Sequence, residues 1–220
     1  MEETAQKKKL YVHVPSHIVR NEDIYLNNEE FAMYARLCFL HFRNPKEKGN
    51  VLEIDHRKLM NFLKITDTRT FKKRVNHLHS LDLIKNEFEK VPTKGKINII
   101  FNDSVIAESE NFTKLSASIF TYFNNDQIDT YAFRQIFYYK SRINKNLDGN
   151  GHDYCFSGFE SMTKRFRISK SKVEEANKQL KKAKLLKIVK HKLDPTHEYI
   201  DDELQYDRYN NHYFVADMLH

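Results

Sequence analysis

One arrangement of apolar and turn-forming residues occurs twice in this chain of 220 residues. Residues 54–66 align with residues 157–169 at an offset of 103, and residues 71–84 align with residues 173–186 at an offset of 102. Few aligned positions are identical, so it is the apolar pattern that repeats. A repeat of roughly a hundred residues predicts two copies of one folding unit. The aligned pairs are Leu59 with Met162, Leu63 with Phe166, Ile65 with Ile168, Phe71 with Val173, Leu78 with Leu180, and Leu81 with Ala183.

In the first copy, apolar residues spaced at 3.6 positions predict three helices. Asn27 and Glu30 form a capping box for the first helix, Asp55 caps the second, and Asp67 or Thr68 caps the third. Turn residues separate these helices from short apolar runs that predict strands. The expected strands are residues 51–54, 84–90 and 96–101, the last two around a turn at 91–95.

The second copy predicts the same order of elements. Its first helix starts at Asp126 or Asp129, its second follows a capping box of Ser157 with Glu160, and its third is capped by Ser169. The expected strands are residues 154–156, 187–193 and 197–200, the last two around a turn at 194–196.

This order of helix, strand, helix, turn, helix, strand, wing and strand resembles a winged helix in both copies. Residues 78–84 (LHSLDLI) and 180–186 (LKKAKLL) resemble the end of a recognition helix that runs into the first wing strand. The resemblance implies a mainly α fold with small β wings (α+β), built as two tandem winged helix-turn-helix domains. The expected divisions are a basic tail at 1–9, a first domain at 10–103, a linker at 104–115, a second domain at 116–200, and an acidic, tyrosine-rich tail at 201–220.

Positive charge is concentrated in two segments. The whole chain carries a net charge of +7 and has a pI of about 9.2. Residues 56–96 hold 11 Lys/Arg against 4 Asp/Glu, and residues 164–192 hold 12 against 2. One basic run alone is as easily a solvated helix face as a binding surface. Two runs at equivalent places of a repeat favour a polyanionic partner.

The third helix of each copy turns polar and basic residues away from its apolar stripe. Arg, Asn and Thr side chains can read base edges in the major groove, whereas Lys mainly contacts phosphate. We therefore expect the first copy to recognise more of the base sequence and the second copy to contribute more positive charge. The predicted DNA-binding residues are Arg69, Thr70, Lys73, Asn76, His77, Lys94 and Lys96 in the first copy, and Lys170, Ser171, Lys172, Lys178, Lys182, Lys190 and Lys192 in the second.

The pairing of two copies is similar to plasmid and phage replication initiators and to the amino-terminal domain of DnaD-type primosome proteins. This resemblance implies a non-enzymatic, sequence-specific binder of double-stranded DNA, acting in replication initiation or in transcriptional regulation of a mobile element. A homodimer or a replication or transcription protein is a further expected partner. The alternative is a protein-binding adaptor, such as a helicase-loading factor. We expect no cofactor and no metal.

Two features invite a nuclease interpretation. His77-Leu78-His79 has the His-apolar-His pattern of rolling-circle nickases, and Tyr138-Tyr139 follows downstream. Residues two apart on a helix point about 200° away from each other, so two such histidines cannot share a metal. Since Leu78 continues a helical stripe, the sequence favours a structural role.

The remaining segments set the cellular context. Cys38 and Cys155 lie in apolar surroundings, too far apart in sequence to suggest a disulfide framework, which fits a reducing cytoplasm. No stretch is apolar for long enough to cross a membrane, so we expect no membrane partner. In the tail, Tyr206, Tyr209 and Tyr213 have helical spacing and predict a helix that docks or dimerises.

Overall fold

The computed structural model describes residues 9–45, 47, 49–143, 152–156, 158–190, 195–200, 203–206 and 211–220, with side chains for all of these except 195–200 and 203–206. Within these residues the fold is mixed α+β, with helices and four two-stranded antiparallel sheets. The coarse fold class predicted from the sequence is therefore confirmed.

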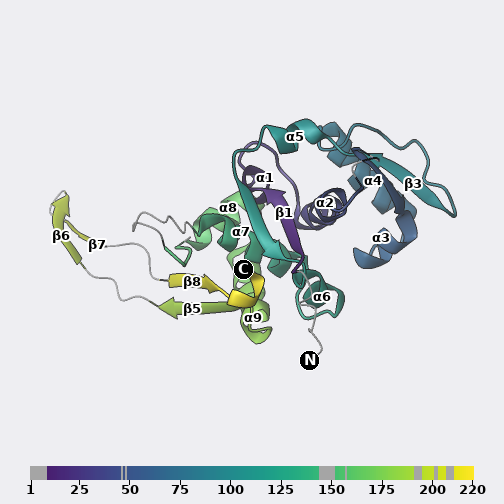
Figure 1. Cartoon of the computed structure of the whole chain (residues 1–220). Coiled ribbons are helices and arrows are strands. Elements are labelled where there is room, and N and C mark those ends of the chain that lie inside the picture. The colour runs from purple at the N-terminus through teal and green to yellow at the C-terminus, as the bar shows by residue number, and fades with distance from the viewer. Residues whose placement is uncertain are drawn as a thin grey trace, which may run out of the picture.

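The elements form two successive series in which strand, short helix and long helix come first (Figure 1). The first series is β1 (Tyr11–Pro15), α1 (Ser16–Arg20), α2 (Asn28–His41), β2 (Val51–Asp55), α3 (His56–Phe62), α4 (Thr68–Ser80), β3 (Lys96–Ile100) and α5 (Asp103–Ala107). The second series is β4 (Phe112–Ser116), α6 (Ile119–Asn124), α7 (Thr130–Arg142), α8 (Phe159–Phe166), α9 (Lys170–Lys182), β5 (Leu186–Lys190), β6 (Pro195–Ile200), β7 (Glu203–Tyr206), β8 (Asn211–Val215) and η2 (Asp217–Leu219).

Residues with a left-handed backbone conformation follow the equivalent helices in both series. Lys64 (φ 55°) follows α3, and Arg167 (φ 53°) follows α8. Asp82 (φ 55°) follows α4, and Lys184 (φ 57°) follows α9. A residue in this conformation ends a helix by letting later N–H groups reach its last carbonyls. The backbone thus repeats at the offsets of 103 and 102 at which the sequence pattern repeats.

Strand order is also the same in both series. In the first, the strand formed by β3 and Phe101 lies between β2 and Ile84, which forms a single bridge to Phe101. In the second, β8 lies between β5 and Cys155, and the backbones of Cys155 and Tyr213 exchange hydrogen bonds of 2.9 and 2.8 Å. The strand that comes last in sequence is therefore central each time.

Helix starts follow the capping residues that the sequence predicted. The Asn27 side chain accepts from the backbone N–H of Glu30 at 2.8 Å, and the Glu30 carboxylate accepts from that of Asn27 at 3.0 Å. Helix α8 differs, because its N-cap is Gly158 without a side-chain bond, while Ser157 lies outside the described residues. The other confirmed caps are Asp55 for α3, Asp67 for α4, Asp129 for α7 and Ser169 for α9.

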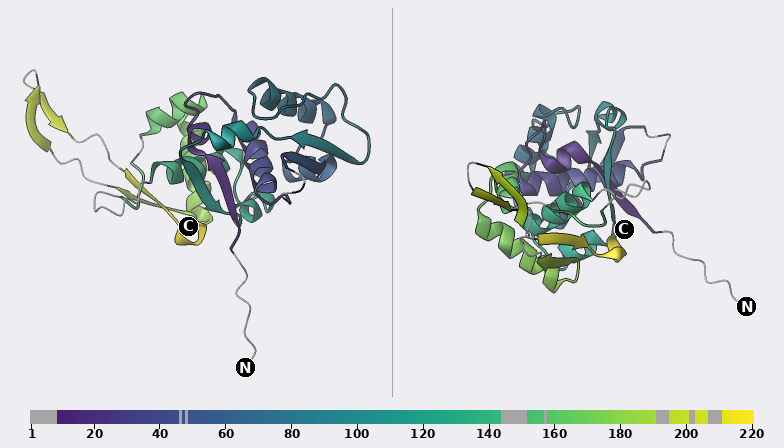
Figure 2. Two further views of the ribbon diagram at one scale, coloured as in Figure 1. Left: turned by 45° about the horizontal axis from the view of Figure 1, so that its top comes forward. Right: turned by 90° about the vertical axis from the view of Figure 1, so that its left-hand side faces the viewer.

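The two series are joined by equivalent strands. β1 pairs with β4 in antiparallel register, centred on His13 opposite Lys114. Helix α7 packs on α2 beside this sheet, with the ring of Phe31 5.5 Å from that of Phe137. Figures 1 and 2 place both helices in the middle of the molecule, between the outer helices of the two series. Buried apolar side chains run continuously through both series as one core.

Two predicted connections are structured differently. The expected linker at 104–115 contains most of α5 and of β4, because Thr113 and Leu115 are buried where β4 pairs with β1. The expected first-wing strand at 84–90 is reduced to its start. The Asn86 side chain donates to the Asn98 carbonyl at 2.9 Å and accepts from the Ile100 N–H at 2.8 Å. The Asn86 side chain thus occupies the backbone groups of β3 that a longer strand after Ile84 would have paired with.

Both predicted strands of the second wing are present, as β5 and β6, but their expected pairing and the expected tail helix were wrong. β5 pairs with β8 instead of residues 197–200, and β6 pairs with β7, with Pro195 as its first residue. The predicted tail helix is absent from the described residues, where Tyr206 ends β7 and Tyr213 lies within β8. Tyr209 and residue 194 lie outside the described residues. The physical reason is that Tyr213 and Val215 are both buried, a spacing of two that a strand satisfies and a helix does not.

Candidate nucleic-acid interface

Helix α4 turns a basic face to solvent because its apolar stripe is buried. Phe71, Val75 and Leu78 are fully buried, which leaves the opposite face outside. On that face Arg69 and Lys73 are exposed, and Thr70 is half-buried. Hydrogen bonds from the Thr70 backbone and side chain, with a smaller contribution from Arg69, lower the pKa of the Asp67 carboxyl. Asp67 therefore stays ionised as the helix cap, beside Arg69.

Two of the predicted base readers on α4 already have partners within the protein. The Asn76 amide donates to the Phe88 carbonyl and accepts from the Phe88 N–H, both at 3.0 Å. His77 Nδ1 lies 2.8 Å from the Glu30 carboxylate at the start of α2. Asn76 thus anchors the irregular segment after α4, and His77 fixes α4 to α2. The Asn76 amide can reach a base edge only if its bonds to Phe88 break, whereas His77 is held through Nδ1.

Helix α9 is the counterpart of α4 in the second series. Val173, Ala176 and Leu180 are buried, and the opposite face is lined by exposed side chains. Lys172 pairs with Glu175 at 2.8 Å, which partly neutralises the first turns. The exposed residues that the sequence predicted on this helix are Lys170, Ser171, Lys172, Lys178 and Lys182.

A buried polar network that the sequence reasoning missed fixes α9 in place. Asn177 Oδ1 accepts from the Tyr139 hydroxyl at 2.8 Å and from Gln135 Nε2 at 2.7 Å. Gln179 exchanges two hydrogen bonds with Asp129, the cap of α7. Such a network resists rotation of α9, because rotation would leave buried polar groups unpaired. The available signal was Asn177, a polar residue on the buried stripe of α9.

The lysines predicted in the two wings differ in their exposure and in their partners. Lys94 and Lys190 are exposed, and Lys96 is exposed but pairs with Glu53 at 2.9 Å. Lys192 lies outside the described residues. Lys72, which the sequence did not single out, donates to the Glu89 carbonyl at 2.6 Å and so helps hold the segment after α4.

The residues of the nickase pattern are parts of packed helices. Leu78 is fully buried within α4, between His77 and His79. Tyr138 and Tyr139 are fully buried within α7, where burial raises the pKa of the Tyr139 hydroxyl well above its usual value. A phenol in that position is neither ionised nor reachable by a phosphodiester.

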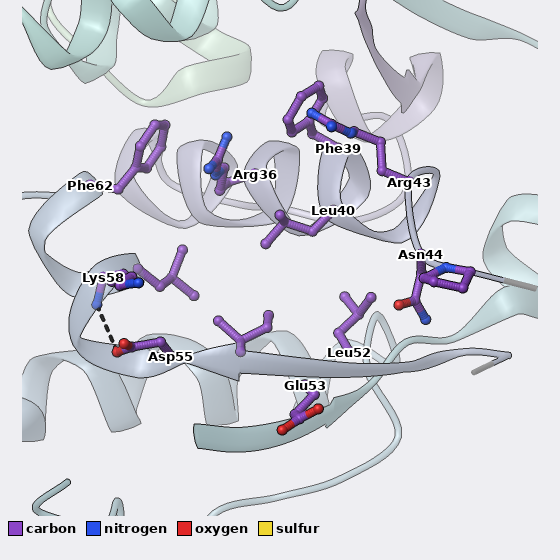
Figure 3. A pocket seen from close by; sticks show the side chains of 13 residues that line it. Arg36, Phe39, Leu40, Arg43, Asn44, Leu52, Glu53, Asp55, Lys58 and Phe62 are labelled. Carbon is purple, nitrogen blue, oxygen red and sulfur yellow. Dashed lines mark hydrogen bonds between the residues drawn. The ribbon is translucent and has the colours of Figure 1, made fainter. Parts of the chain in front are cut away.

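A cavity of about 490 Å³ lies between α2 on one side and β2 and α3 on the other (Figure 3). The Arg36 guanidinium stands over the rings of Phe62 (4.5 Å), Phe120 (5.1 Å) and Phe39 (5.3 Å). The Arg43 guanidinium also lies over the Phe39 ring, 5.1 Å from its centroid. Phe120 belongs to α6, so this cluster ties the second series to α2.

Among the residues that the structure describes, none of the helices combines the length and the apolar character needed to span a bilayer. A scan against protein-family models and a search of curated proteins gave no match to this chain.

Proposed function

We propose that this protein binds double-stranded DNA through α4 and α9, each acting as the recognition helix of a winged-helix unit. The observation that carries the proposal is the equivalence of these two helices. Each follows a left-handed turn, buries one apolar stripe, and presents exposed cations on its opposite face. A basic helix exposed at the same place in two copies of one unit suits two successive contacts with a duplex.

The number of cations that can contact phosphate determines how strongly DNA affinity should depend on salt concentration. Exposed cations that no described carboxylate neutralises occur on both helices and in both wings, for example Lys73, Lys94, Lys178, Lys182 and Lys190. If about five to eight cations contact phosphates, log K should fall against log[salt] with a slope of roughly −4 to −7. A protein whose lysines are only solvated would have no such slope.

Sequence readout is assigned to the amino-terminal end of α4. Arg69 can hold guanine O6 and N7 together, and Thr70 can contact a thymine methyl. Asn76 and His77 are assigned a positioning role, because the Asn76 amide bonds to Phe88 and His77 Nδ1 lies against Glu30. Loss of one base-reading contact should cost about 1–3 kcal/mol in affinity for the preferred site alone.

The connection between the halves supports reading of two adjacent sites. The β1–β4 sheet and the α2–α7 packing hold both units in one continuous core. A fixed separation between two recognition helices favours a DNA site with two half-sites at one spacing. Replication initiation or transcriptional control on a plasmid- or phage-type element is the biological role that we propose for such a binder.

A competition experiment tests the proposal. The full chain is mixed with a labelled duplex from the region upstream of its own gene, and unlabelled upstream or random duplex is added. Stronger competition by the upstream duplex supports sequence-specific binding, and equal competition leaves only nonspecific binding. Charge reversal at Lys170 and Lys178 should weaken duplex binding. If both reversals leave it intact while abolishing binding to a replication protein, the adaptor function replaces our proposal.

A further inference from the structure

The cavity between α2 and the β2–α3 segment combines an apolar wall with a cationic rim (Figure 3). Arg36 and Arg43 project from α2 along one side of it, with Phe39 between them. A volume of about 490 Å³ lies within the range of about 300–1,000 Å³ that is typical of sites for small molecules. The apolar wall consists of Leu40, Leu52, Ile54 and Leu59.

The two guanidinium groups on this rim have aromatic neighbours but no acceptor. Both lie over the Phe39 ring, Arg36 at 5.3 Å and Arg43 at 5.1 Å from its centroid. Within the described residues, the arginines that pair with a carboxylate are Arg20 and Arg142. In that same part of the chain, neither Arg36 nor Arg43 forms an ion pair or donates a hydrogen bond. A guanidinium that lies over a ring uses its flat face, so the N–H donors in its plane stay open.

The two charges also act on each other. Arg36 is half-buried, and burial followed by the charge of Arg43 lowers the pKa of Arg36. Two like charges beside one ring interact unfavourably, and an anion bound between them would relieve that repulsion. The chain thus keeps two cations together where a bound anion would stabilise both.

The carboxylates that line the cavity have other partners. Glu53 is exposed on the face of β2 turned away from α2, and it pairs with Lys96 at 2.9 Å (Figure 3). Asp55 accepts from the backbone N–H of Lys58 at 3.1 Å as the cap of α3. The Lys58 side chain is exposed and adds a further cation to the cavity lining. Residues 46 and 48, which follow soon after α2, are lysines and bring no negative charge.

We propose that this cavity binds a small organic anion, a carboxylate carried on an aromatic or aliphatic body. The carboxylate accepts hydrogen bonds from Arg36 and Arg43, and the body lies against the apolar wall. An apolar segment of another protein would instead cover two charges without pairing them, which is costly. The inference does not depend on DNA binding, because neither arginine belongs to α4 or α9.

The test uses the full chain and the fluorescent probe 1-anilinonaphthalene-8-sulfonate, which joins an anionic group to aromatic rings. R36Q and R43Q should each bind the probe about tenfold more weakly, since each loses a charge-assisted hydrogen bond. The matched control is R167Q on the second series, where the Arg167 guanidinium lies 4.1 Å from the ring centroid of Tyr25. R167Q should stay within about twofold of wild type. Thermal melting verifies folding, and R43Q replaces an exposed side chain, so it serves even if R36Q unfolds.

Competition separates the anionic group from the apolar body. 4-Phenylbutyrate should displace the probe, and the uncharged 4-phenylbutanol should do so about tenfold more weakly. Octanoate, compared with 4-phenylbutyrate, identifies whether the preferred body is aliphatic or aromatic. No probe binding by wild type, equal effects of R43Q and R167Q, or equal displacement by acid and alcohol would overturn the inference. A dimer in sedimentation velocity that R43Q dissociates, with no displacement by either acid, would overturn it in favour of a second copy of the chain.

Discussion

Arg134 is a fully buried cation at the junction of the two halves, and its removal should destabilise the whole chain. The guanidinium on α7 donates to the carbonyls of Leu26 and Ile18 (3.3 Å to Ile18) and to Asn21 Oδ1 at 2.5 Å. It also stands 4.8 Å from the ring centroid of Phe31. Burial lowers the pKa of Arg134 to about 9, so the side chain stays charged at pH 7.

The expected loss follows from these contacts. Each hydrogen bond from a charged donor contributes about 1.5–3 kcal/mol, but burial of the charge offsets several kcal/mol of that gain. Arg134→Ala leaves a cavity and unpaired carbonyls and should cost about 4 kcal/mol. Arg134→Met keeps most of the packing and removes the buried charge, so about 2 kcal/mol is expected. For a chain of this size, the two variants should melt about 8–16 °C and about 4–8 °C below wild type.

Thermal unfolding followed by circular dichroism, together with urea unfolding, measures both variants. The matched control is Arg142→Met on the same helix, where the partly exposed guanidinium lies 3.6 Å from Glu22 and should contribute less than about 1 kcal/mol. If Arg134→Met melts within a degree of wild type, or no lower than Arg142→Met, Arg134 does not hold the halves together.

Three further predictions concern the caps, the wing and the thiols. Asn27→Ala removes the capping box with Glu30 and should lower the free energy of unfolding by about 1 kcal/mol in urea titrations, and no change would refute a stabilising cap. Asn76→Ala releases Phe88, so it should weaken binding to all duplex sequences equally in anisotropy, whereas loss confined to one sequence would indicate base reading. Burial raises the pKa of the Cys155 thiol from 9.0 to about 12. Since the unfolded thiol ionises first, stability should fall as pH rises above about 9, by up to about 1.4 kcal/mol per pH unit. Cys155→Ala in reducing buffer should lessen that slope, and an unchanged slope would contradict it.

Helix starts and buried helix faces were predictable, because both depend on residues close together in the sequence. A cap such as Asn27, Asp67 or Ser169 bonds to an N–H within three residues, so the information lies in the adjacent sequence. The apolar stripe of α4 was likewise visible, because Phe71 and Val75 are spaced for one helix face. These features set which faces of α4 and α9 are exposed.

Strand pairing was less predictable, because it depends on residues distant in sequence. β5 could have paired with the next apolar segment, but its partner β8 follows only after β6 and β7. The β1–β4 pair joins segments about a hundred residues apart, with Tyr11 opposite Ser116. Neither pairing leaves a signal in local periodicity beyond the alternation of Tyr213 and Val215.

The central position of α7 did leave a signal. Every residue from Ala132 to Tyr139 is buried, so the helix is covered on all sides by both halves. A helix without a polar face is typical of the middle of a fold. Arg134 and Gln135 interrupt its apolar run, and both proved to be buried hydrogen-bonding groups. The engagement of Asn76 and His77 within the protein had no such signal, since their partners come from other segments.

Salt titration of duplex binding tests our proposal that α4 and α9 contact one duplex together. Wild type, R69Q/K73Q and K178Q/K182Q are compared with the same duplex by fluorescence anisotropy. If both helices contact phosphates, each double substitution weakens binding and makes the slope of log K against log[salt] less negative by up to about 1.8. Slopes that remain equal to wild type in both variants would contradict it.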